Sequence, residues 1–345
     1  MKGDTVLLDT LDGRRAAAWM RDGRLEDLLI DNRTDDGHPP VGSLFRGRVD
    51  RPMKGQGGVF LSLPGGATAF LRDTRGLAQG QSLLVQVTGF AEAGKAIPVT
   101  NRILFKSKYA IVTPGVPGVN ISRSIRDEDL RMRLRAIAET SDLDVGTGLI
   151  LRSAAAEGDD EAVAEDVAEM VALCAAIMSE IDGAPELLLE GPDAHHMAWR
   201  EWGDPTDIDT TAGCFAARGV LDEIDTLRSD KVSLTAGGSM WVEPTRALVA
   251  IDVNTGPDTS LAAALKVNLA AARELPRQLR LRGLGGQITM DLAPVVKKDR
   301  KTIEQTLRNA FRADAIETAL VGWTPLGHFE LQRKRERRPL SEVLV

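Results

Sequence analysis

The fold of the second half of the chain is decided by two apolar runs that each end near an aspartate, Ala247-Leu248-Val249-Ala250-Ile251-Asp252-Val253-Asn254 and Gln287-Ile288-Thr289-Met290-Asp291-Leu292. Short apolar runs of this length are typical of buried strands. Residues 259–282 have the apolar spacing of a long helix, which the stretch Gly283-Leu284-Gly285-Gly286 ends. Strand, helix and strand in that order predict a right-handed crossover with two parallel strands.

Asp252 and Asp291 lie at matching ends of these two predicted strands. Ligand sites in such sheets lie at the carboxyl ends of the strands, so we expect both carboxylates to face one crevice. Together with the amide of Asn254 they suit Mg²⁺, a hard cation that takes few protein ligands and activates water beside a phosphodiester. The alternative is that each aspartate caps the loop or helix that follows it. For a single aspartate we favour capping, whereas the pair on successive strands favours a metal site.

Basic residues accompany this pair. Arg273, Arg277 and Arg280 follow a three-to-four spacing on the predicted helix and are predicted to meet an RNA backbone. Residues 273–338 contain fifteen Lys/Arg against eight Asp/Glu, a local net charge of +7 on a chain whose net charge is −7. Solvated helix faces would explain these charges equally well, so charge permits RNA binding without demonstrating it. The run Arg333–Arg338 is either an RNA clamp, which we favour, or a solubilising tail.

Length and composition bound the remaining possibilities. A chain of 345 residues is too long for one ordinary core and predicts about two to four modules, and its 43% hydrophobic share is that of a globular protein. The sequence shows no signal-peptide pattern and no apolar run long enough to span a membrane. Cys174 and Cys214 are the only cysteines, which excludes a disulfide framework and suits a reducing cytosol. We therefore expect a cytoplasmic protein with no membrane partner.

The N-terminal part of the chain predicts two β-structures. Residues 5–30 alternate in the strand manner around two Asp-Gly turns, which predicts an antiparallel meander. Five short strands with glycine-rich connections then fit a small OB-type barrel, a fold that commonly binds oligonucleotides. Phe60 and Phe70 fall on its second and third strands, where aromatics can stack on bases, although spacing alone favours a core position for both. The predicted barrel strands are 43–50, 58–63, 67–71, 82–88 and 96–100.

Several motifs in the second half together resemble the catalytic half of the RNase E/G endoribonucleases. Ala250-Ile251-Asp252-Val253-Asn254-Thr255 is similar to the family's A-I-D-[IV]-N-[ST] motif. The run from Arg277 to Gly286 is similar to R-Q-[LI]-R-L-R-[DN]-[LI]-G-G, and residues 288–291 match the strand that follows it. Asn268-Leu269-Ala270-Ala271-Ala272 is similar to N-[LT]-E-A-A, with Ala270 where Glu is usual. By this resemblance Asp252 and Asp291 bind the catalytic Mg²⁺, and Asn254 positions the attacking water or the scissile phosphate.

Upstream motifs resemble the RNA-binding parts of the same family more weakly. Phe45-Arg46-Gly47-Arg48-Val49 with the two later phenylalanines is similar to the S1 domain, and Lys95 matches part of K-G-x-x-L-T. The resemblance therefore implies RNA binding by Phe60, Phe70 and Lys95. Ile121-Ser122-Arg123 is similar to I-S-R-R and residues 148–153 to G-[LM]-I-[VI]-R-T, which implies that Arg123, Arg152 and Ser153 sense a 5′-monophosphate. Ser124 stands where the family has a second Arg, so we expect a weakened sensor.

The resemblance also implies a multidomain fold of α/β and α+β classes. An OB-type S1 barrel (41–105) is inserted in an RNase H-like subdomain (1–40 plus 186–236). A 5′-sensor region (106–185) and a DNase I-like α/β catalytic subdomain (237–345) follow. The sequence lacks the family's C-P-x-C zinc link, so a zinc-bridged assembly is not expected and a homodimer would use other surfaces.

Two classes of function stay open at this stage. The first is a Mg²⁺-dependent endoribonuclease that cleaves single-stranded RNA with a metal-activated water, in RNA processing or decay. The second is a catalytically weak RNA-binding relative whose sensor and dimer elements have eroded. The intact Asp252, Asn254 and Asp291 favour the first, because a pure binder gains nothing from carboxylates that repel phosphate. A metal-dependent hydrolase of another substrate is a distant third.

Overall fold

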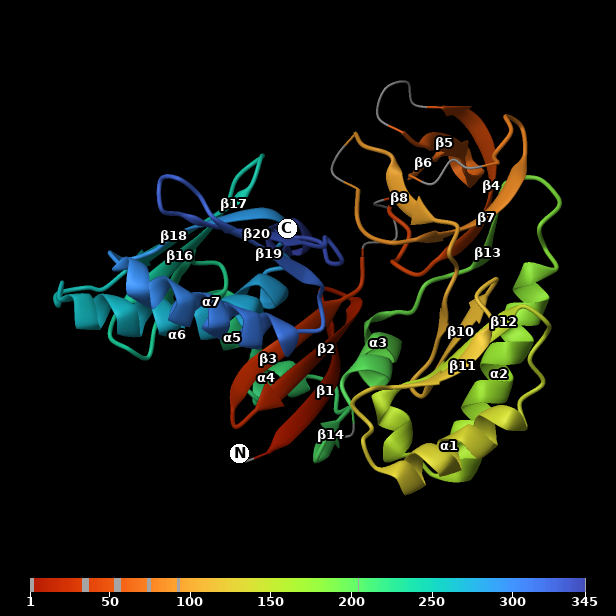
Figure 1. Cartoon of the computed structure of the whole chain (residues 1–345), viewed down its shortest axis with the longest axis horizontal. Coiled ribbons are helices and arrows are strands. Elements are labelled where there is room, and N and C mark those ends of the chain that lie inside the picture. Colours follow the sequence, from red (N-terminus) through yellow and green to blue (C-terminus); the bar gives the residue numbers. More distant parts are fainter. Residues whose placement is uncertain are drawn as a thin grey trace. The chain divides into compact units, whose positions relative to one another are not determined.

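The structure, a computed structural model, describes residues 3–32, 37–52, 57–72, 76–91, 94–203 and 205–344. The chain forms two compact units, one of residues 1–33 with 205–345 and one of residues 34–204. The second unit is therefore inserted into the first. Both units mix helices and sheets, which Figure 1 colours by position in the sequence.

An antiparallel meander begins the first unit, as the turn residues predict. Asp12 and Asp22 have φ of 50° and 49°, and each precedes a glycine that also has positive φ. This is the backbone of two-residue type I′ turns, whose twist matches that of the strands they join. The sheet has the order β14-β1-β2-β3 and packs against the short helices α4, α5 and α8. The elements are β1 (Asp4–Leu11), β2 (Arg14–Arg21), β3 (Arg24–Ile30), β14 (Asp207–Asp209), α4 (Cys214–Ala217), α5 (Val220–Thr226) and α8 (Leu340–Val343).

A six-stranded sheet in the order β15-β16-β17-β18-β20-β19 forms the rest of the first unit. Strands β17 and β18 are parallel and are joined by the long helix α6, which confirms the predicted strand–helix–strand unit. The other strand pairs are antiparallel. The elements are β15 (Lys231–Ser233), β16 (Ser239–Pro244), β17 (Val249–Asn254), α6 (Leu261–Leu281), β18 (Gly286–Asp291), α7 (Lys297–Arg312), β19 (Thr318–Trp323) and β20 (Phe329–Arg333).

One face of this sheet packs on α6 and α7, which run along it together in Figure 1. Every second residue of each central strand enters the shared core, as Ile251 and Met290 do. The side chain of Ser260 accepts a hydrogen bond from the backbone N–H of Ala263 and so caps the start of α6. Pro276 lies inside α6, which nevertheless continues to Leu281.

A closed five-stranded barrel occupies part of the second unit. Its strands run in the order β4-β5-β6-β8-β7, and pairing of β4 with β7 closes the barrel. This confirms the five predicted barrel strands and is consistent with an OB-type barrel. Strand β13 pairs with β4 of the barrel, whereas the family resemblance places residues 186–189 in the RNase H-like subdomain of residues 1–40 and 186–236. The elements are β4 (Leu44–Pro52), β5 (Val59–Ser62), the 3₁₀ turn Pro64–Gly66, β6 (Thr68–Leu71), β7 (Ser82–Val87), β8 (Ile97–Thr100) and β13 (Glu186–Leu189).

A second sheet of this unit has the order β11-β12-β10-β9 and packs against helices α1 and α2. Asp127 and Asp159 cap the two helices by accepting hydrogen bonds from backbone N–H groups of the first turn. The helix α3 follows β13. The elements are β9 (Phe105–Lys106), β10 (Ala110–Pro114), β11 (Gly118–Ile121), α1 (Glu128–Glu139), β12 (Thr147–Leu151), the 3₁₀ turn Ser153–Ala156, α2 (Asp160–Met178) and α3 (Ala194–Glu201).

Both cysteines are buried inside these cores, Cys174 in the second unit and Cys214 in the first. Burial raises the pKa of each thiol to about 11, so both stay protonated and unreactive at neutral pH. Among the described residues, no helix has the length and apolar character needed to cross a bilayer.

Candidate active site

The two aspartates predicted from the sequence lie side by side on neighbouring strands. In the parallel register of β17 and β18, Asp252 is paired with Asp291. Adjacent strands are about 4.8 Å apart, so the two carboxylates extend from neighbouring positions of one sheet face. Ile251 and Val253 are buried in the core beneath, and the alternation of the strand therefore directs Asp252 and Asn254 to the opposite face.

Within the first unit, α6 and α7 cover the core face of the sheet, whereas described residues of the opposite face such as Trp241 and Glu243 are exposed, so that face is open. Asp252, Asn254 and Asp291 are all exposed, and 69% of the Asp291 side chain is accessible. The carboxylates thus stand at the surface of a buried strand pair and not inside the core.

Hydrogen bonding and a nearby imidazole define the local geometry. The Asn254 amide Nδ2 donates to Asp252 Oδ2 at 2.7 Å, which fixes the amide and leaves its carbonyl oxygen free to act as a ligand or acceptor. His328, the residue just before β20, has its Nε2 3.8 Å from Asp291 Oδ1. Among the described residues, no Lys or Arg lies within ion-pair distance of either aspartate. Two unneutralised carboxylates and an amide are oxygen donors that fit Mg²⁺, which keeps several waters and needs few protein ligands.

The backbone around Asn254 depends on one glycine. A Cβ added to Gly238 would lie 2.3 Å from the Asn254 carbonyl oxygen and 2.8 Å from a methyl group of Val267. Only glycine therefore lets the turn before β16 approach the end of β17 this closely. A cavity of about 300 Å³ adjoins this end of the strand and is lined in part by Thr255, Asp258 and Lys266.

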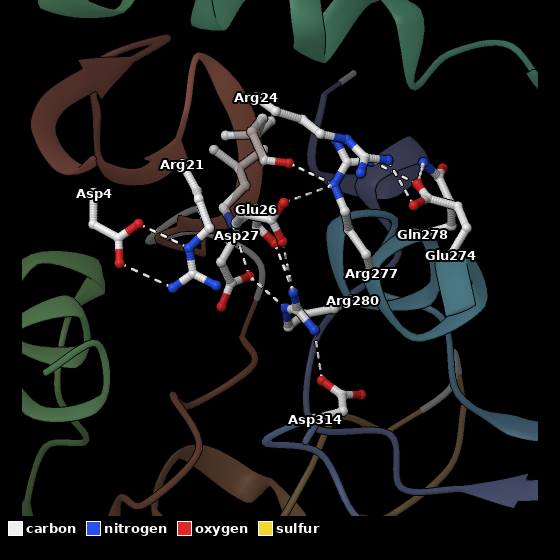
Figure 2. A network of polar contacts seen from close by, with 12 residues as sticks. Asp4, Arg21, Arg24, Glu26, Asp27, Glu274, Arg277, Gln278, Arg280 and Asp314 are labelled. Carbon is white, nitrogen blue, oxygen red and sulfur yellow. Dashed lines mark hydrogen bonds and ion pairs between the residues drawn. The ribbon is translucent and has the colours of Figure 1, made fainter. Parts of the chain in front are cut away.

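The predicted RNA-binding arginines of α6 divide into one exposed and two internal side chains. Arg273 is exposed. Arg277 donates to the carbonyl of Leu25 at 2.7 Å, and Arg280 pairs with Asp314 at 2.6 Å. Figure 2 shows both guanidinium groups inside a network of acidic side chains and backbone carbonyls. In this structure both charges join α6 to β3 and its neighbours, and a contact of these two arginines with RNA stays a prediction.

The C-terminal basic run is internal in the same way. Arg333 is 1% exposed and pairs with Asp314 at 2.6 Å, because the alternation of β20 turns its side chain into the core. Arg337 pairs with both oxygens of the buried Asp27. The favoured interpretation of this run as an RNA clamp is wrong for these two residues, which are structural.

The predicted stacking pair lies on the outer wall of the barrel. Phe60 and Phe70 are directly paired between β5 and β6, with ring centroids 5.5 Å apart. The residues that alternate with them, such as Leu61 and Ala69, fill the barrel core, and both phenylalanines are half-buried outside that core. The core interpretation that spacing favoured is therefore wrong. Lys95 is exposed just before β8, whose Pro98 extends the row beyond Phe70.

The predicted 5′-sensor residues share one sheet edge. Strands β11 and β12 are parallel and end together at Ile121 and Leu151, so Arg123 and the pair Arg152-Ser153 follow neighbouring strand ends. Arg123 and Ser153 are exposed. Ser124, which replaces the second arginine of the family motif, has its hydroxyl 2.9 Å from that of Ser122.

Arg152 differs from Arg123 and Ser153, because its guanidinium is hydrogen-bonded to other groups of the second unit. It donates to three backbone carbonyls, those of Ser107, Lys108 and Arg200, and pairs with Glu201 at 2.8 Å. Burial alone would raise the pKa of Glu201, but hydrogen bonding and the charges of its basic neighbours outweigh it and hold that pKa below its ordinary value. Arg152 therefore anchors α3 to the sheet, and its predicted bidentate contact with a 5′-phosphate does not fit this arrangement.

Sequence reasoning missed two residues beside the aspartates. The strands that the sequence predicts do not include β20, which begins just after His328, so the sequence does not place this histidine beside Asp291. Trp241 lies on β16 directly opposite Asp252 in the antiparallel register. In the predicted strand 239–242, alternation places Trp241 on the face opposite to that of Met240 and Val242, which are buried. The sequence does not show which residue of β17 this strand pairs with, so it does not place Trp241 beside Asp252.

Comparison with known proteins agrees with these motifs. The model of the Ribonuclease E/G family matches residues 105–210 and 206–336, which is more than half of the chain. Ribonuclease G of Salmonella typhimurium is 26% identical over 98% of this chain and 81% of its own length, and that of Escherichia coli is 27% identical with the same coverage. Ribonuclease E of Nostoc sp. is 28% identical over 95% of this chain, which spans 55% of that longer protein.

Proposed function

Because the chain belongs to the ribonuclease E/G family, we propose that it is an endoribonuclease that cleaves single-stranded RNA with the help of Mg²⁺. The observation that carries the proposal is the in-register pair Asp252 and Asp291 on an open sheet face, with no described cationic partner. On a surface that only binds RNA, exposed carboxylates would repel the phosphates of the RNA. A divalent cation turns the same pair into a phosphate-binding site.

In this proposal Asp252 and Asp291 hold the metal, which supplies activation of water and neutralisation of charge on the scissile phosphate. Asn254 keeps Asp252 in place through its 2.7 Å hydrogen bond and offers its carbonyl oxygen to the attacking water. Water adds to phosphorus as the bond to the 3′ oxygen breaks, and that oxygen takes a proton. The products are a 5′-phosphate end and a 3′-hydroxyl end.

The rest of the chain supplies RNA binding. The paired rings of Phe60 and Phe70 offer stacking positions for bases, each of which contributes roughly 1–3 kcal/mol in comparable barrels. Lys95 on the same unit and Arg273 on α6 are exposed cations suited to phosphates. Arg123 and Ser153 are the donors that remain exposed for a 5′-monophosphate. We place the reaction in the cytoplasm, as a step of RNA processing or decay. A homodimer of this chain is compatible with that role.

The second candidate is a relative that binds RNA and cleaves it weakly. It draws on the internal position of Arg152 and on Ser124, which together leave a reduced 5′-phosphate site. The intact pair of aspartates favours the nuclease over this candidate.

The deciding experiment measures cleavage of a 5′-monophosphorylated, single-stranded, AU-rich oligoribonucleotide in Mg²⁺ or EDTA. Asp252→Asn and Asp291→Asn should each reduce cleavage by more than about 100-fold, because even residues one step removed from a metal cost 10- to 100-fold. RNA binding should persist in both variants. Asp225→Asn, in an exposed ion pair with Arg228, is the matched control and should keep full activity. Metal-independent cleavage, or full activity in both aspartate variants, would remove the assignment.

A further inference from the structure

Trp241 stands in one row with the two aspartates on the open face of the sheet. It is paired with Lys231 of β15 on one side and with Asp252 of β17 on the other. Asp252 is in turn paired with Asp291. Lysine, tryptophan and two carboxylates therefore lie on four consecutive strands at one level of the sheet. Since neighbouring strands are about 4.8 Å apart, the indole is adjacent to the proposed metal site.

The exposure of Trp241 is not explained by packing. Trp241 is 37% exposed and lies outside the core that its neighbours Met240 and Val242 help to form. Trp323 in the same sheet is a useful contrast, because it packs edge-on against Phe329 and donates its indole N–H to Glu304 at 2.6 Å. Trp323 thus stabilises the fold through specific contacts. Trp241 presents an aromatic surface to solvent instead.

The cation beside this ring has the chemistry of a phosphate ligand. The Lys231 ammonium lies 5.9 Å from the centroid of the Trp241 ring, at the outer limit of a cation–π contact. Lys231 is exposed, and its flexible stem lets the ammonium move from the ring to a phosphate without unfolding the strand. An aromatic ring with an adjacent ammonium is the combination that holds single-stranded nucleic acid, through a base and its phosphate.

We propose that Trp241 is a base-stacking platform of the active site. The base of a nucleotide next to the scissile phosphate stacks on the indole, and Lys231 binds the phosphate of that nucleotide. The stacking fixes the RNA against the pair Asp252 and Asp291 and favours an unpaired base at this position. The inference rests on the proposed nuclease function and adds a subsite to it.

The alternative role for Trp241 is stabilisation of the sheet, and the choice of variants separates the two. Trp241→Val keeps a β-branched residue suited to a strand but removes the aromatic face, whereas Trp241→Phe retains a smaller one. Trp199→Leu is the matched control, because Trp199 is 45% exposed on α3 in the second unit. Thermal unfolding of each variant reports any loss of stability.

The experiment uses single-stranded oligoribonucleotides that carry one abasic residue at successive positions around the cleavage site. With intact RNA, Trp241→Val should lower kcat/KM by about 5- to 150-fold, the range expected for one base–aromatic stack, and Trp241→Phe by less. One abasic position should slow the wild type by a similar factor and leave Trp241→Val unaffected. Trp199→Leu should behave as the wild type on every substrate.

Equal effects of every abasic residue on the wild type and on Trp241→Val would overturn the stacking role. So would a loss of activity that follows a loss of thermal stability. Binding of the same RNAs in EDTA, followed by quenching of indole fluorescence, tests the platform without cleavage. Abasic-sensitive quenching that disappears in Trp241→Phe, in a protein that never cleaves, would support the platform and contradict the nuclease. Cleavage without abasic-sensitive quenching would support the nuclease and contradict the platform.

Discussion

Charged side chains are arranged in opposite ways at two places in the first unit. Where α6 meets β3, acidic and basic groups are buried together, and Figure 2 shows Arg280 beside Asp314 in this network. The side chain of Asp314 is 1% exposed and also pairs with Arg333 of β20. On the open face of the six-stranded sheet, Asp252 and Asp291 are exposed and have no described arginine or lysine partner. The same kind of side chain therefore serves structure in one place and is available for ligands in the other.

The difference follows from the cost of burying charge. A carboxylate removed from water must be paired and hydrogen-bonded, since the desolvation of an isolated ion costs several kcal/mol. An exposed carboxylate carries no such requirement, so nothing in the fold explains two of them side by side. Like charges on adjacent strand positions repel and weaken the sheet. A bound cation would remove that repulsion, which makes the open pair the better indicator of function.

The largest expected effect is the loss of a buried partner. Asp314→Ala leaves the guanidinium groups of Arg280 and Arg333 without their shared carboxylate and should lower the free energy of unfolding by about 3–5 kcal/mol. Asp291→Asn should change it by less than about 0.5 kcal/mol, as an exposed substitution does. Urea unfolding, with hydrogen exchange of β3 and β20 to localise the effect, measures both. Equal losses in the two variants would erase the distinction between the two places.

The strands that position the active site could be predicted from the sequence because their signal is local. Apolar runs that end in Asp252 and Asp291 identify buried strands, and the helix between them forces the strands to be parallel. The five barrel strands could be predicted equally well, because glycine turns separate them in the sequence. The outward position of Phe60 and Phe70 could not be predicted, since alternation assigns residues to two faces without saying which face is the core.

The internal contacts of the arginines could not be predicted for a related reason. The spacing of Arg273, Arg277 and Arg280 identifies a helix face but not the surface that this face meets. Their partners, such as Asp27 and Asp314, are distant in the sequence and become neighbours only when β3 docks on α6. Charge patterns alone therefore cannot separate an RNA-binding stripe from an internal ion-pair network.

The next largest effect concerns the second unit, where the guanidinium of Arg152 is paired with Glu201 and Arg123 is exposed. Arg152→Ala removes hydrogen bonds to three carbonyls and the pair with Glu201, and should destabilise the unit by roughly 1.5–3 kcal/mol. Glu201 keeps Lys106 and Arg200 as partners, which limits the loss. Arg123→Ala should leave stability unchanged and reduce the advantage of 5′-phosphorylated over 5′-hydroxyl RNA.

Unfolding curves and the ratio of cleavage rates on the two RNAs test this pair. A 5′-phosphate advantage that disappears in Arg152→Ala, with stability retained, would show that the guanidinium leaves Glu201 to bind RNA. An advantage absent from the wild type would show that the exposed donors do not form a sensor.

The smallest effect is the pH dependence of one member of the buried network, Glu274. Burial alone would raise its pKa, but hydrogen bonding from Gln278 and the charges of Arg277 and Arg24 hold that pKa below the ordinary 4.5. A carboxylate whose folded-state pKa is depressed stabilises the protein above its unfolded-state pKa and loses this contribution as the pH falls through the folded-state value.

Glu274→Gln should therefore lower the free energy of unfolding at pH 7, and the difference from the wild type should shrink as the pH falls below about 4.5. Asp225→Asn, in an exposed ion pair, is the control and should show a small difference at pH 7. Urea unfolding between pH 3 and pH 7, a range that brackets ordinary carboxylate pKa values of about 4, gives the comparison. A Glu274→Gln difference that stays constant with pH would mean that the charge of Glu274 contributes nothing, and that hydrogen bonding alone joins this part of α6 to its neighbours.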